Sequence, residues 1–381
     1  MASGMLDHRA REETTIDTDG LTLRTGVEIE LLAPVGSDRQ ALADVLAARS
    51  GGRVRRSFHT DSEPSAVPGV GVFRHLSPAF DVVDGQGRPL ARLVDDVTIE
   101  ADLAPVPGRR DLPGHRGWYR VLCDDARLLR LVERHADPDA SLADVLRPVA
   151  DLFGVAVDVL PGAARVNDAA GASIAVAMPL PPGRERPCEI VTPPLEHAHV
   201  RTLEALLAPA RDLGFTVPQE AAVHLHVDGG PYRAPAPFAN LVRLFAHWRE
   251  PLWAALGTNP ACRRLAPLPD ALLDLVERDH AGTAEGWARL QQDARTIGLT
   301  KYADVNLTQL VARRPVRDTV EVRILPGSID GHDVVRRARL VEQLLLRCRE
   351  PRPLPLPGAD AAHDPRAALS ALAADRQEAT R

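Results

Sequence analysis

Gly26-Val27-Glu28-Ile29-Glu30-Leu31-Leu32 alternates apolar residues with two glutamates. This period of two predicts a β-strand with one polar face. Because successive side chains of a strand point to opposite faces, Glu28 and Glu30 lie side by side. Two adjacent carboxylates repel each other unless a cation, an arginine or bulk water compensates them, so the segment indicates a divalent metal site. A strand with a solvated acidic face is the alternative interpretation.

A second polar row follows in Val223-His224-Leu225-His226-Val227-Asp228. The three apolar residues face one side of a predicted strand, and His224, His226 and Asp228 face the other. Imidazoles at positions i and i+2 are common contacts for metal ions or phosphate. A histidine pair that faces solvent is an equally simple interpretation of this segment alone.

Two further predicted strands carry charged residues among apolar ones. Glu321 and Arg323 share a face in Thr319-Val320-Glu321-Val322-Arg323, where an ordinary ion pair is the alternative to a functional site. Glu189 is the lone carboxylate in Pro187-Cys188-Glu189-Ile190-Val191, before two prolines. Burying an isolated carboxylate costs several kcal/mol, so Glu189 is expected to have a partner.

Composition excludes several classes of protein. The 381 residues are 45% hydrophobic and 26% charged, which is normal for a globular protein with one large core or two smaller ones. A net charge of -6 and a pI near 6.1 argue against a nucleic-acid partner. The N-terminal residues lack the apolar core of a signal peptide, and no apolar run is long enough to cross a membrane. With four widely spaced cysteines and no zinc or disulfide spacing, the chain is predicted to be cytoplasmic.

Lys301 is the only lysine among 46 basic residues, so the other 45 are arginines. If surface charge were the only requirement, arginine would be expected at this position too. A compact ammonium that contacts phosphate or carboxylate as a point charge is a role that the planar guanidinium does not fill. Chance survival of a lysine at the surface is the alternative.

The pattern of elements predicts an α+β fold around a largely antiparallel sheet. There is no regular β-α alternation and no Gly-rich phosphate loop, which argues against a Rossmann fold or a Walker-type NTPase. Strands are predicted near 21–33, 71–83, 90–102, 172–179, 187–192, 220–228, 303–311 and 318–325. Helices are predicted near 38–49, 124–135, 141–152, 198–213, 237–256, 283–296 and 332–348.

Taken in order, the segments GVEIE, EIVTPPL, HLHVD, KYADVN and TVEVRILPG resemble the amidoligase family, relatives of glutamine synthetase and glutamate-cysteine ligase. The resemblance spans about residues 22–330. It implies a glutamine-synthetase-like curved antiparallel sheet with flanking helices, whose concave face binds ATP and divalent ions. The implied organisation is a flexible N-terminal tail (1–19), a catalytic domain (20–349) with a helical insertion near 104–170, and a Pro/Ala-rich C-terminal tail (350–381).

The same resemblance implies roles for individual residues. Glu28, His224 and Glu321 match ligands of the ion beside the nucleotide phosphates. Glu30 and Glu189 match ligands of a second ion nearer the substrate carboxylate. The expected phosphate contacts are His226, Lys301 and Arg323, and Asn306 is expected to orient substrate or nucleotide. Glutamine synthetase has another glutamate shortly after the position of Glu189, whereas this chain has Thr192 and two prolines, which leaves Asp96 as a substitute ligand.

The implied reaction is ATP-dependent joining of a carboxylate and an amine through an acyl phosphate, with Mg²⁺ or Mn²⁺ as cofactor. Arg323, Lys301 and Glu321 are the expected catalytic residues, and the substrates are small molecules or peptides. One alternative is a binuclear metallohydrolase in which the H-x-H strand binds metal and Lys301 is a carbamylated bridging ligand. Only 153 residues follow Asp228, too few for the rest of such a barrel. A protein that binds nucleotide or metabolite without catalysis is the other alternative.

Two further segments each keep two interpretations, and a third has one. Residues 53–65, with Arg53, His59 and Asp61, are either a loop covering adenine or substrate or a solvated connector. Trp118 and Tyr119 either line a substrate pocket or fill the core. Residues 236–257 are predicted to form a packed helix that serves as scaffold.

Overall fold

The computed structural model describes residues 20–64, 72–103, 117–123, 125–262, 264–278 and 280–375. The predicted N-terminal tail and residues 104–116 of the predicted insertion lie outside this part. The strands are β1 (Thr25–Leu32), β2 (Arg53–Pro64), β3 (Val72–Val83), β4 (Pro89–Val94), β5 (Tyr119–Cys123), β6 (Asp158–Leu160), β7 (Ala163–Asn167), β8 (Ser173–Pro179), β9 (Pro187–Val191), β10 (Ala222–Asp228), β11 (Val305–Asn306) and β12 (Thr319–Pro326). The helices are α1 (Arg39–Arg49), α2 (Ala126–His135), α3 (Leu142–Val145), α4 (Arg147–Phe153), α5 (His199–Asp212), α6 (Pro235–His247), α7 (Arg249–Leu256), α8 (Asp270–Val276), α9 (Ala284–Thr296), α10 (Thr308–Val311), α11 (Gly331–Cys348), α12 (Asp360–His363) and α13 (Pro365–Ala374).

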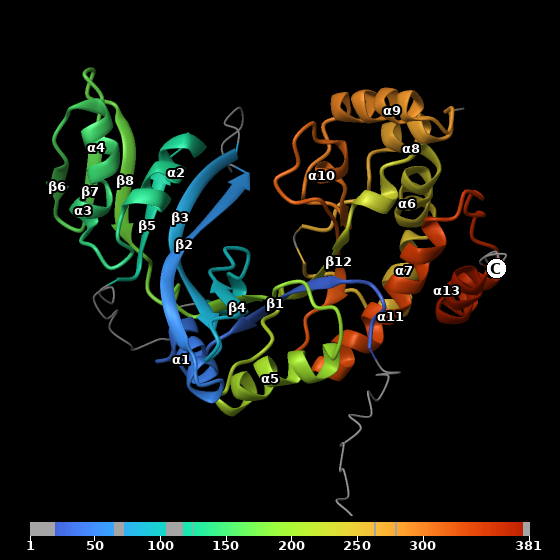
Figure 1. The fold of residues 1–381 in the computed structure, drawn as a ribbon, viewed down its shortest axis with the longest axis horizontal. Helices are drawn as coiled ribbons and strands as arrows, with labels where there is room; N and C mark the ends of the chain where they lie inside the picture. Colours follow the sequence, from blue (N-terminus) through green and yellow to red (C-terminus); the bar gives the residue numbers. More distant parts are fainter. Residues whose placement is uncertain are drawn as a thin grey trace, which may run out of the picture.

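All these strands belong to one 12-stranded sheet in the order β11-β12-β10-β1-β9-β4-β3-β5-β8-β7-β6, with β2 added on β3. Neighbouring strands pair antiparallel. The predicted mixture of helices with a large antiparallel sheet is therefore confirmed. Figure 1 shows the long strands β2 and β3 rising on one side of the molecule and helices α6 to α10 on the other, with β1 between them.

The strand β1 is buried along its whole length, although half of its residues are not apolar. Val27, Ile29 and Leu31 belong to the main hydrophobic core, which also includes residues of α1, α5 and α11. Helices α1, α5 and α11 lie along one side of β1 in Figure 1. The alternation of the sequence thus gives β1 one face for this core and leaves the face with Glu28 and Glu30 for the candidate site.

A second hydrophobic core forms the arm at the end of the sheet. It combines Phe58 and Leu76 of the long strands with apolar residues of α2, α3, α4 and strands β5, β7 and β8. The described part of the region predicted as a helical insertion near 104–170 contains the strands β5, β6 and β7 as well as helices α2, α3 and α4. Short apolar stretches of about five residues gave no decisive periodicity there, and pairing with the sheet determined their structure.

Residues 53–65 were expected to be a loop or connector, but residues 53–64 form β2. Each β2 residue from Arg53 to Pro64 has a partner on β3. The segment is rich in charged residues and lacks a regular apolar alternation. A strand that pairs with one neighbour only has an open edge, and such strands commonly carry charged side chains. Its stability as a strand comes from the long hydrogen-bonded partner and not from its own pattern.

Other boundaries differ from prediction for local reasons. The strand expected at 90–102 ends at Val94, and the chain turns at Val97 and Thr98. The strand expected at 303–311 is divided into β11 and the short helix α10. The helix expected near 237–256 is divided into α6 and α7 at Trp248.

The aromatic residues Trp118 and Tyr119 fill cores and do not line the main pocket. Trp118 packs on Phe80 and lies under the guanidinium of Arg39. The predicted C-terminal tail includes α12 and α13, and α13 packs against α11 and α7. Within the described residues, no helix is long and apolar enough to cross a membrane.

Candidate active site

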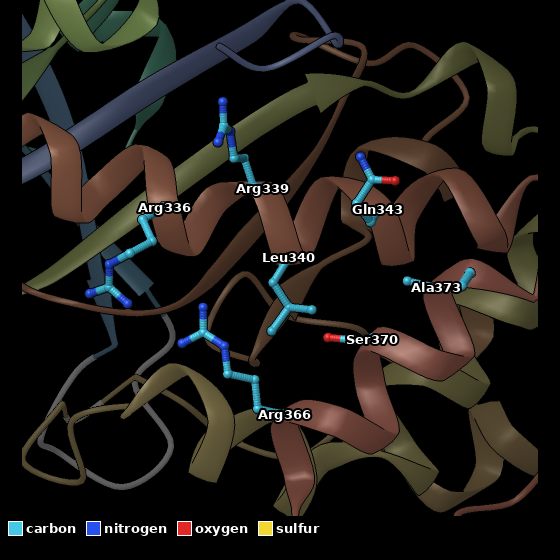
Figure 2. Close-up of a pocket in the computed structure, with 8 residues that line it drawn as sticks. Arg336, Arg339, Leu340, Gln343, Arg366, Ser370 and Ala373 are labelled. Atoms are coloured by element: carbon cyan, nitrogen blue, oxygen red, sulfur yellow. The ribbon is translucent and has the colours of Figure 1, made fainter. Parts of the chain in front are cut away.

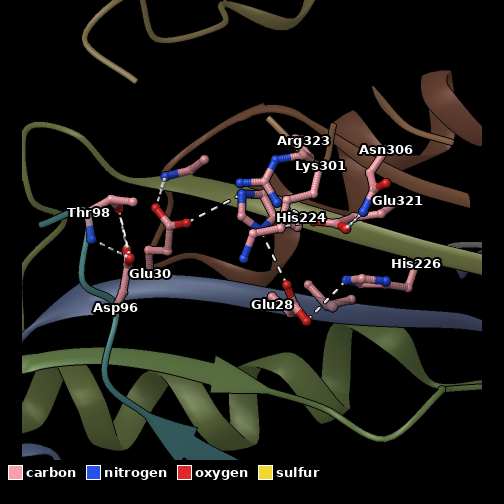
Figure 3. Close-up of polar contacts among 12 residues, drawn as sticks. Glu28, Glu30, Asp96, Thr98, His224, His226, Lys301, Asn306, Glu321 and Arg323 are labelled. Atoms are coloured by element: carbon pink, nitrogen blue, oxygen red, sulfur yellow. Dashed lines mark hydrogen bonds and ion pairs between the residues drawn. The ribbon is translucent and has the colours of Figure 1, made fainter. Parts of the chain in front are cut away.

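The register of three strand pairs brings the predicted polar residues together. Glu28 of β1 lies opposite His224 of β10, and Glu30 lies opposite Glu189 of β9. On the other side of β10, His226 lies opposite Glu321 of β12. Residues in direct register have their Cβ atoms about 5 Å apart, so their side chains meet on the same face of the sheet. Figure 3 shows Glu28 below His224 and Glu30 to the left of it, with Glu321 and His226 to the right.

Oxygen and nitrogen atoms of these residues form two groups that share Glu28. One group consists of Glu28, His226 and Glu321, and the other of Glu28, Glu189 and His224, with the ligand atoms in each within 4.8 Å of one another. The Nε2 atom of His226 lies 3.1 Å from Oε1 of Glu28. The Nδ1 atom of His224 lies 3.3 Å from Oε2 of the same carboxylate. Carboxylate oxygens with imidazole nitrogens fit Mn²⁺ well and Mg²⁺ when carboxylates dominate.

The grouping differs in detail from the expected ligand sets. His226, expected to contact phosphate, joins Glu28 and Glu321, whereas His224, expected in that set, joins Glu189. Glu30 belongs to neither group. Its Oε2 accepts a 2.7 Å hydrogen bond from the backbone N–H of Ala222, and its Oε1 lies 3.3 Å from Nε2 of His224.

Charge in this cluster is unbalanced. Burial, together with the charge of Glu28, raises the pKa of Glu189 well above its ordinary value. Burial and the nearby Asp96 do the same to the pKa of Glu30. Burial also acts on Glu28, but the charges and hydrogen bonds of His226 and His224 outweigh it and hold the pKa well below its usual range. A divalent ion among these carboxylates would supply the missing positive charge.

A scan of family models identifies the chain. The family model described as an amidoligase enzyme matches residues 21–345. The chain belongs to the amidoligase family. No curated protein and no solved structure matches this amidoligase in the comparisons.

Arg323 of β12 and Asn306 of β11 complete one side of the candidate site of this amidoligase. The guanidinium of Arg323 forms an ion pair with Oε1 of Glu321, and Nδ2 of Asn306 donates a 2.8 Å hydrogen bond to Oε2. Burial lowers the pKa of Arg323, but the charges of Glu321 and Glu30 outweigh it, so the net shift is upward. This arrangement places a permanent positive charge and an amide at the edge of the group formed by Glu28, His226 and Glu321.

All of the predicted residues line one cavity of about 600 Å³. Its floor is formed by β1, β9, β10 and β12, and one of its walls comes from the arm. The arm contributes cavity residues without an assigned role, and β4 contributes one more: His59, Thr60, Asp61, Arg74, Arg130 and Glu133 belong to the arm, and Arg92 to β4. The segment with His59 and Asp61 was expected to be a covering loop or a solvated connector, whereas it is a strand paired with β3.

Lys301 lies on this cavity and pairs with the arm. Its Nζ is 3.5 Å from Oδ1 of Asp61, a residue 240 positions earlier in the chain. The side chain of Lys301 is 37% exposed and that of Asp61 13% exposed. Lys301, the only lysine in the sequence, therefore connects its own side of the cavity with the arm.

Asp96, which was expected as a substitute ligand, lines the same cavity as Glu30 and Glu189 but belongs to neither group of ligand atoms among the described residues. Its carboxylate accepts hydrogen bonds from the backbone and hydroxyl of Thr98. Burial raises its pKa. The neighbouring Asp95 has a different role, because it is buried among Arg184, Arg120 and Arg39 behind the site.

A second hollow, of about 490 Å³, lies between α11 and α13 (Figure 2). Arg336, Arg339 and Arg366 surround it, with Leu340 and Ala373 among its other lining residues. None of its lining residues is a carboxylate or a histidine. This hollow therefore lacks the metal-binding chemistry of the cavity on the sheet.

Proposed function

We propose that this amidoligase is an ATP-dependent carboxylate-amine ligase that forms an amide or peptide-like bond through an acyl phosphate. The observation that carries the proposal is the position of Glu28, which is shared by two groups of ligand atoms on one face of the sheet. A ligase of this kind handles a triphosphate and a carboxylate at once, and two cation positions beside each other suit both.

We propose that the five residues of the two groups of ligand atoms hold divalent ions. Glu28, His226 and Glu321 suit one ion, and Glu28, His224 and Glu189 suit the other, with Glu30 beside them. When bound, Mg²⁺ or Mn²⁺ neutralises charge on the phosphates and on the substrate carboxylate. The curved sheet is proposed to correspond to that of glutamine synthetase.

Arg323 is proposed to act on the transferring phosphoryl group. Its ion pair with Glu321 and the hydrogen bond from Asn306 to the same carboxylate keep the guanidinium at the edge of the cavity. A fixed positive charge there stabilises charge that spreads over the phosphoryl oxygens. Lys301, on the same cavity, is the second cation proposed to reach the phosphates, and no covalent nucleophile is needed.

The binuclear hydrolase gains no support from the site. A bridging carbamylated lysine would have to lie between the two groups of ligand atoms. Lys301 belongs to neither group and pairs with Asp61 on the wall formed by the arm. The proposed partners of the protein are a carboxylate and an amine, each a small molecule or a peptide, and neither nucleic acid nor a membrane.

Calorimetric titration tests this function without knowledge of the substrates. ATP and a non-hydrolysable analogue are added to the purified protein with and without Mg²⁺ or Mn²⁺, and to the Glu28→Gln variant. Nucleotide binding that requires the metal and is lost in the variant supports the ligase. Tight binding of metal without nucleotide binding would contradict it and favour a hydrolase.

A further inference from the structure

One carboxylate on the cavity lies outside the two groups of ligand atoms on the floor. Asp61 lies on β2, on the wall formed by the arm, and its Oδ1 is 3.5 Å from the ammonium nitrogen of Lys301. The carboxylates of Glu28, Glu189 and Glu321 all belong to the groups of ligand atoms on the floor. Asp61 is thus placed to serve a different reactant from the one that the floor serves.

The position next to Asp61 is built for an ammonium group. Besides the carboxylate, the ring of Tyr302 lies there, with its centroid 5.4 Å from Nζ of Lys301. The guanidinium of Arg264 lies 5.1 Å from the centroid of the same ring. A carboxylate with an aromatic face is the usual protein environment for alkylammonium groups. Lys301 is the chain's own alkylammonium in that position.

Two imidazoles that add no positive charge lie beside Asp61. His59 lies two residues earlier on the same face of β2 and also lines the cavity. His75 of β3 lies opposite Asp61 in the register. Burial lowers the pKa of each histidine to about 4, so both imidazoles are neutral at pH 7.

We propose that Asp61 binds the ammonium group of the amine substrate, and that this substrate is a primary alkylamine. The inference rests on the proposed ligase function. When nucleotide enters, the ammonium of Lys301 turns from Asp61 to the phosphoryl oxygens, and the substrate ammonium takes its place. The exchange explains why this position carries a flexible point charge instead of one of the 45 arginines.

The protons of the step balance between Asp61 and the leaving group. The substrate ammonium gives one proton to the carboxylate of Asp61, and the free amine attacks the carbonyl carbon of the acyl phosphate. A carbon–nitrogen bond forms while the bond between that carbon and the phosphate oxygen breaks, and phosphate leaves with the electron pair. The second proton of the nitrogen passes to the departing phosphate, which is released as hydrogen phosphate. Amide and phosphate are the products.

A chemical-rescue experiment tests the position directly. Replacing Lys301 with alanine removes three carbons and the ammonium, which is the structure of n-propylammonium. We expect n-propylammonium, measured by calorimetry at constant ionic strength, to bind Lys301→Ala at least about tenfold more tightly than the wild type. Adding Asp61→Asn to Lys301→Ala is expected to weaken this binding at least about tenfold. Neutral n-propanol is expected not to bind.

Two further variants keep the result interpretable. Asp61→Glu in the Lys301→Ala background keeps the charge and is expected to retain binding. Glu133→Gln removes an exposed carboxylate that lines the same cavity from α2, and it is expected to change binding less than about twofold. If n-propylammonium fails to bind Lys301→Ala, or binds equally well without the Asp61 carboxylate, the inference is wrong.

Parallel titration with ATP and Mn²⁺ separates this inference from the proposed function. Binding of n-propylammonium without metal-dependent nucleotide binding overturns the ligase, and with it the assignment of the ammonium to an amine substrate. Nucleotide binding without rescue by n-propylammonium overturns only the role of Asp61.

Discussion

Glu28 and His224 are direct partners in the antiparallel register of β1 and β10, and Oε2 of Glu28 lies 3.3 Å from Nδ1 of His224. The other oxygen of Glu28 lies 3.1 Å from Nε2 of His226. One carboxylate thus contacts both histidines of the neighbouring strand. A defect at Glu28 would disturb both groups of ligand atoms at once, which makes it the most informative position for mutation.

The Glu28→Gln variant is expected to lose metal-dependent nucleotide binding by at least about 100-fold, because a neutral amide replaces the carboxylate shared by both groups. The fold should persist, since glutamine has the same shape. The measurement is calorimetry with ATP and Mn²⁺. Asp228→Asn, at the exposed end of β10, is the matched control and should bind like the wild type. Equal affinity in Glu28→Gln would refute the site.

Divalent metal is expected to stabilise the protein against heat, because it relieves the repulsion among buried carboxylates in the native state only. At 100 times the dissociation constant, the gain is about 2.7 kcal/mol, which is a shift of several degrees in Tm. EDTA should reverse the shift, and Glu189→Gln should reduce it. Differential scanning calorimetry with and without Mn²⁺ provides the test, and an unchanged Tm would argue against metal binding.

Asp95→Asn is expected to lower the free energy of unfolding by about 3–5 kcal/mol, since it leaves buried guanidinium groups without their counterion. Asp95 is 1% exposed, and its Oδ1 lies 2.9 Å from Nη2 of Arg184. Burial alone would raise its pKa, but Arg184 and Arg39 outweigh that effect and lower it. Denaturant unfolding measures the change.

Asp139→Asn is the control for Asp95, because Asp139 pairs with Arg56 but is itself 64% exposed. Its loss should cost less than about 1 kcal/mol. Similar losses in the two variants would show that the cluster around Asp95 has no special role in stability.

Stability is expected to fall as pH decreases from 6.5 to about 4, because burial lowers the pKa of His75 and of His59 from 6.5 to about 4. In this window the unfolded chain binds a proton at each histidine before the native state does. Each histidine therefore contributes stability that is complete above pH 6.5 and is lost toward pH 4, with a slope of about 1.4 kcal/mol per pH unit.

The His75→Gln variant checks this assignment. Its urea unfolding between pH 6.5 and 5 should show a slope smaller by one proton than that of the wild type. Replacing the exposed His363 by glutamine should leave the slope as it is. A wild-type slope in His75→Gln would mean that other groups cause the acid sensitivity.

Alternation in the sequence correctly predicted which residues share a face. Val27, Ile29 and Leu31 lie in the main core, while Glu28 and Glu30 face the cavity. The same holds for β10 and β12, because strands with one buried face must follow a period of two. The antiparallel sheet and the gathering of the polar residues in one cavity were therefore accessible before the structure.

The residues of the arm could not be placed in this way. The charged segment of β2 has no apolar alternation, and it becomes a strand only because β3 supplies a partner along its length. Asp61 and Lys301 are 240 residues apart, and nothing local in either segment indicates the other. Likewise, the grouping of His226 with Glu321 and of His224 with Glu189 depends on the register of the strands.

By itself the sequence determined the chemistry of the floor: which strands exist, which side chains they turn to one face, and that this face is rich in carboxylates and imidazoles. The tertiary structure decided how those side chains are grouped, that Glu28 is shared, and that the arm brings Asp61 to Lys301. The physical reason is the distance along the chain over which each property is set. Side-chain alternation is a property of the local backbone, whereas register and contacts between distant segments are fixed only when the whole sheet is paired and its cores are packed.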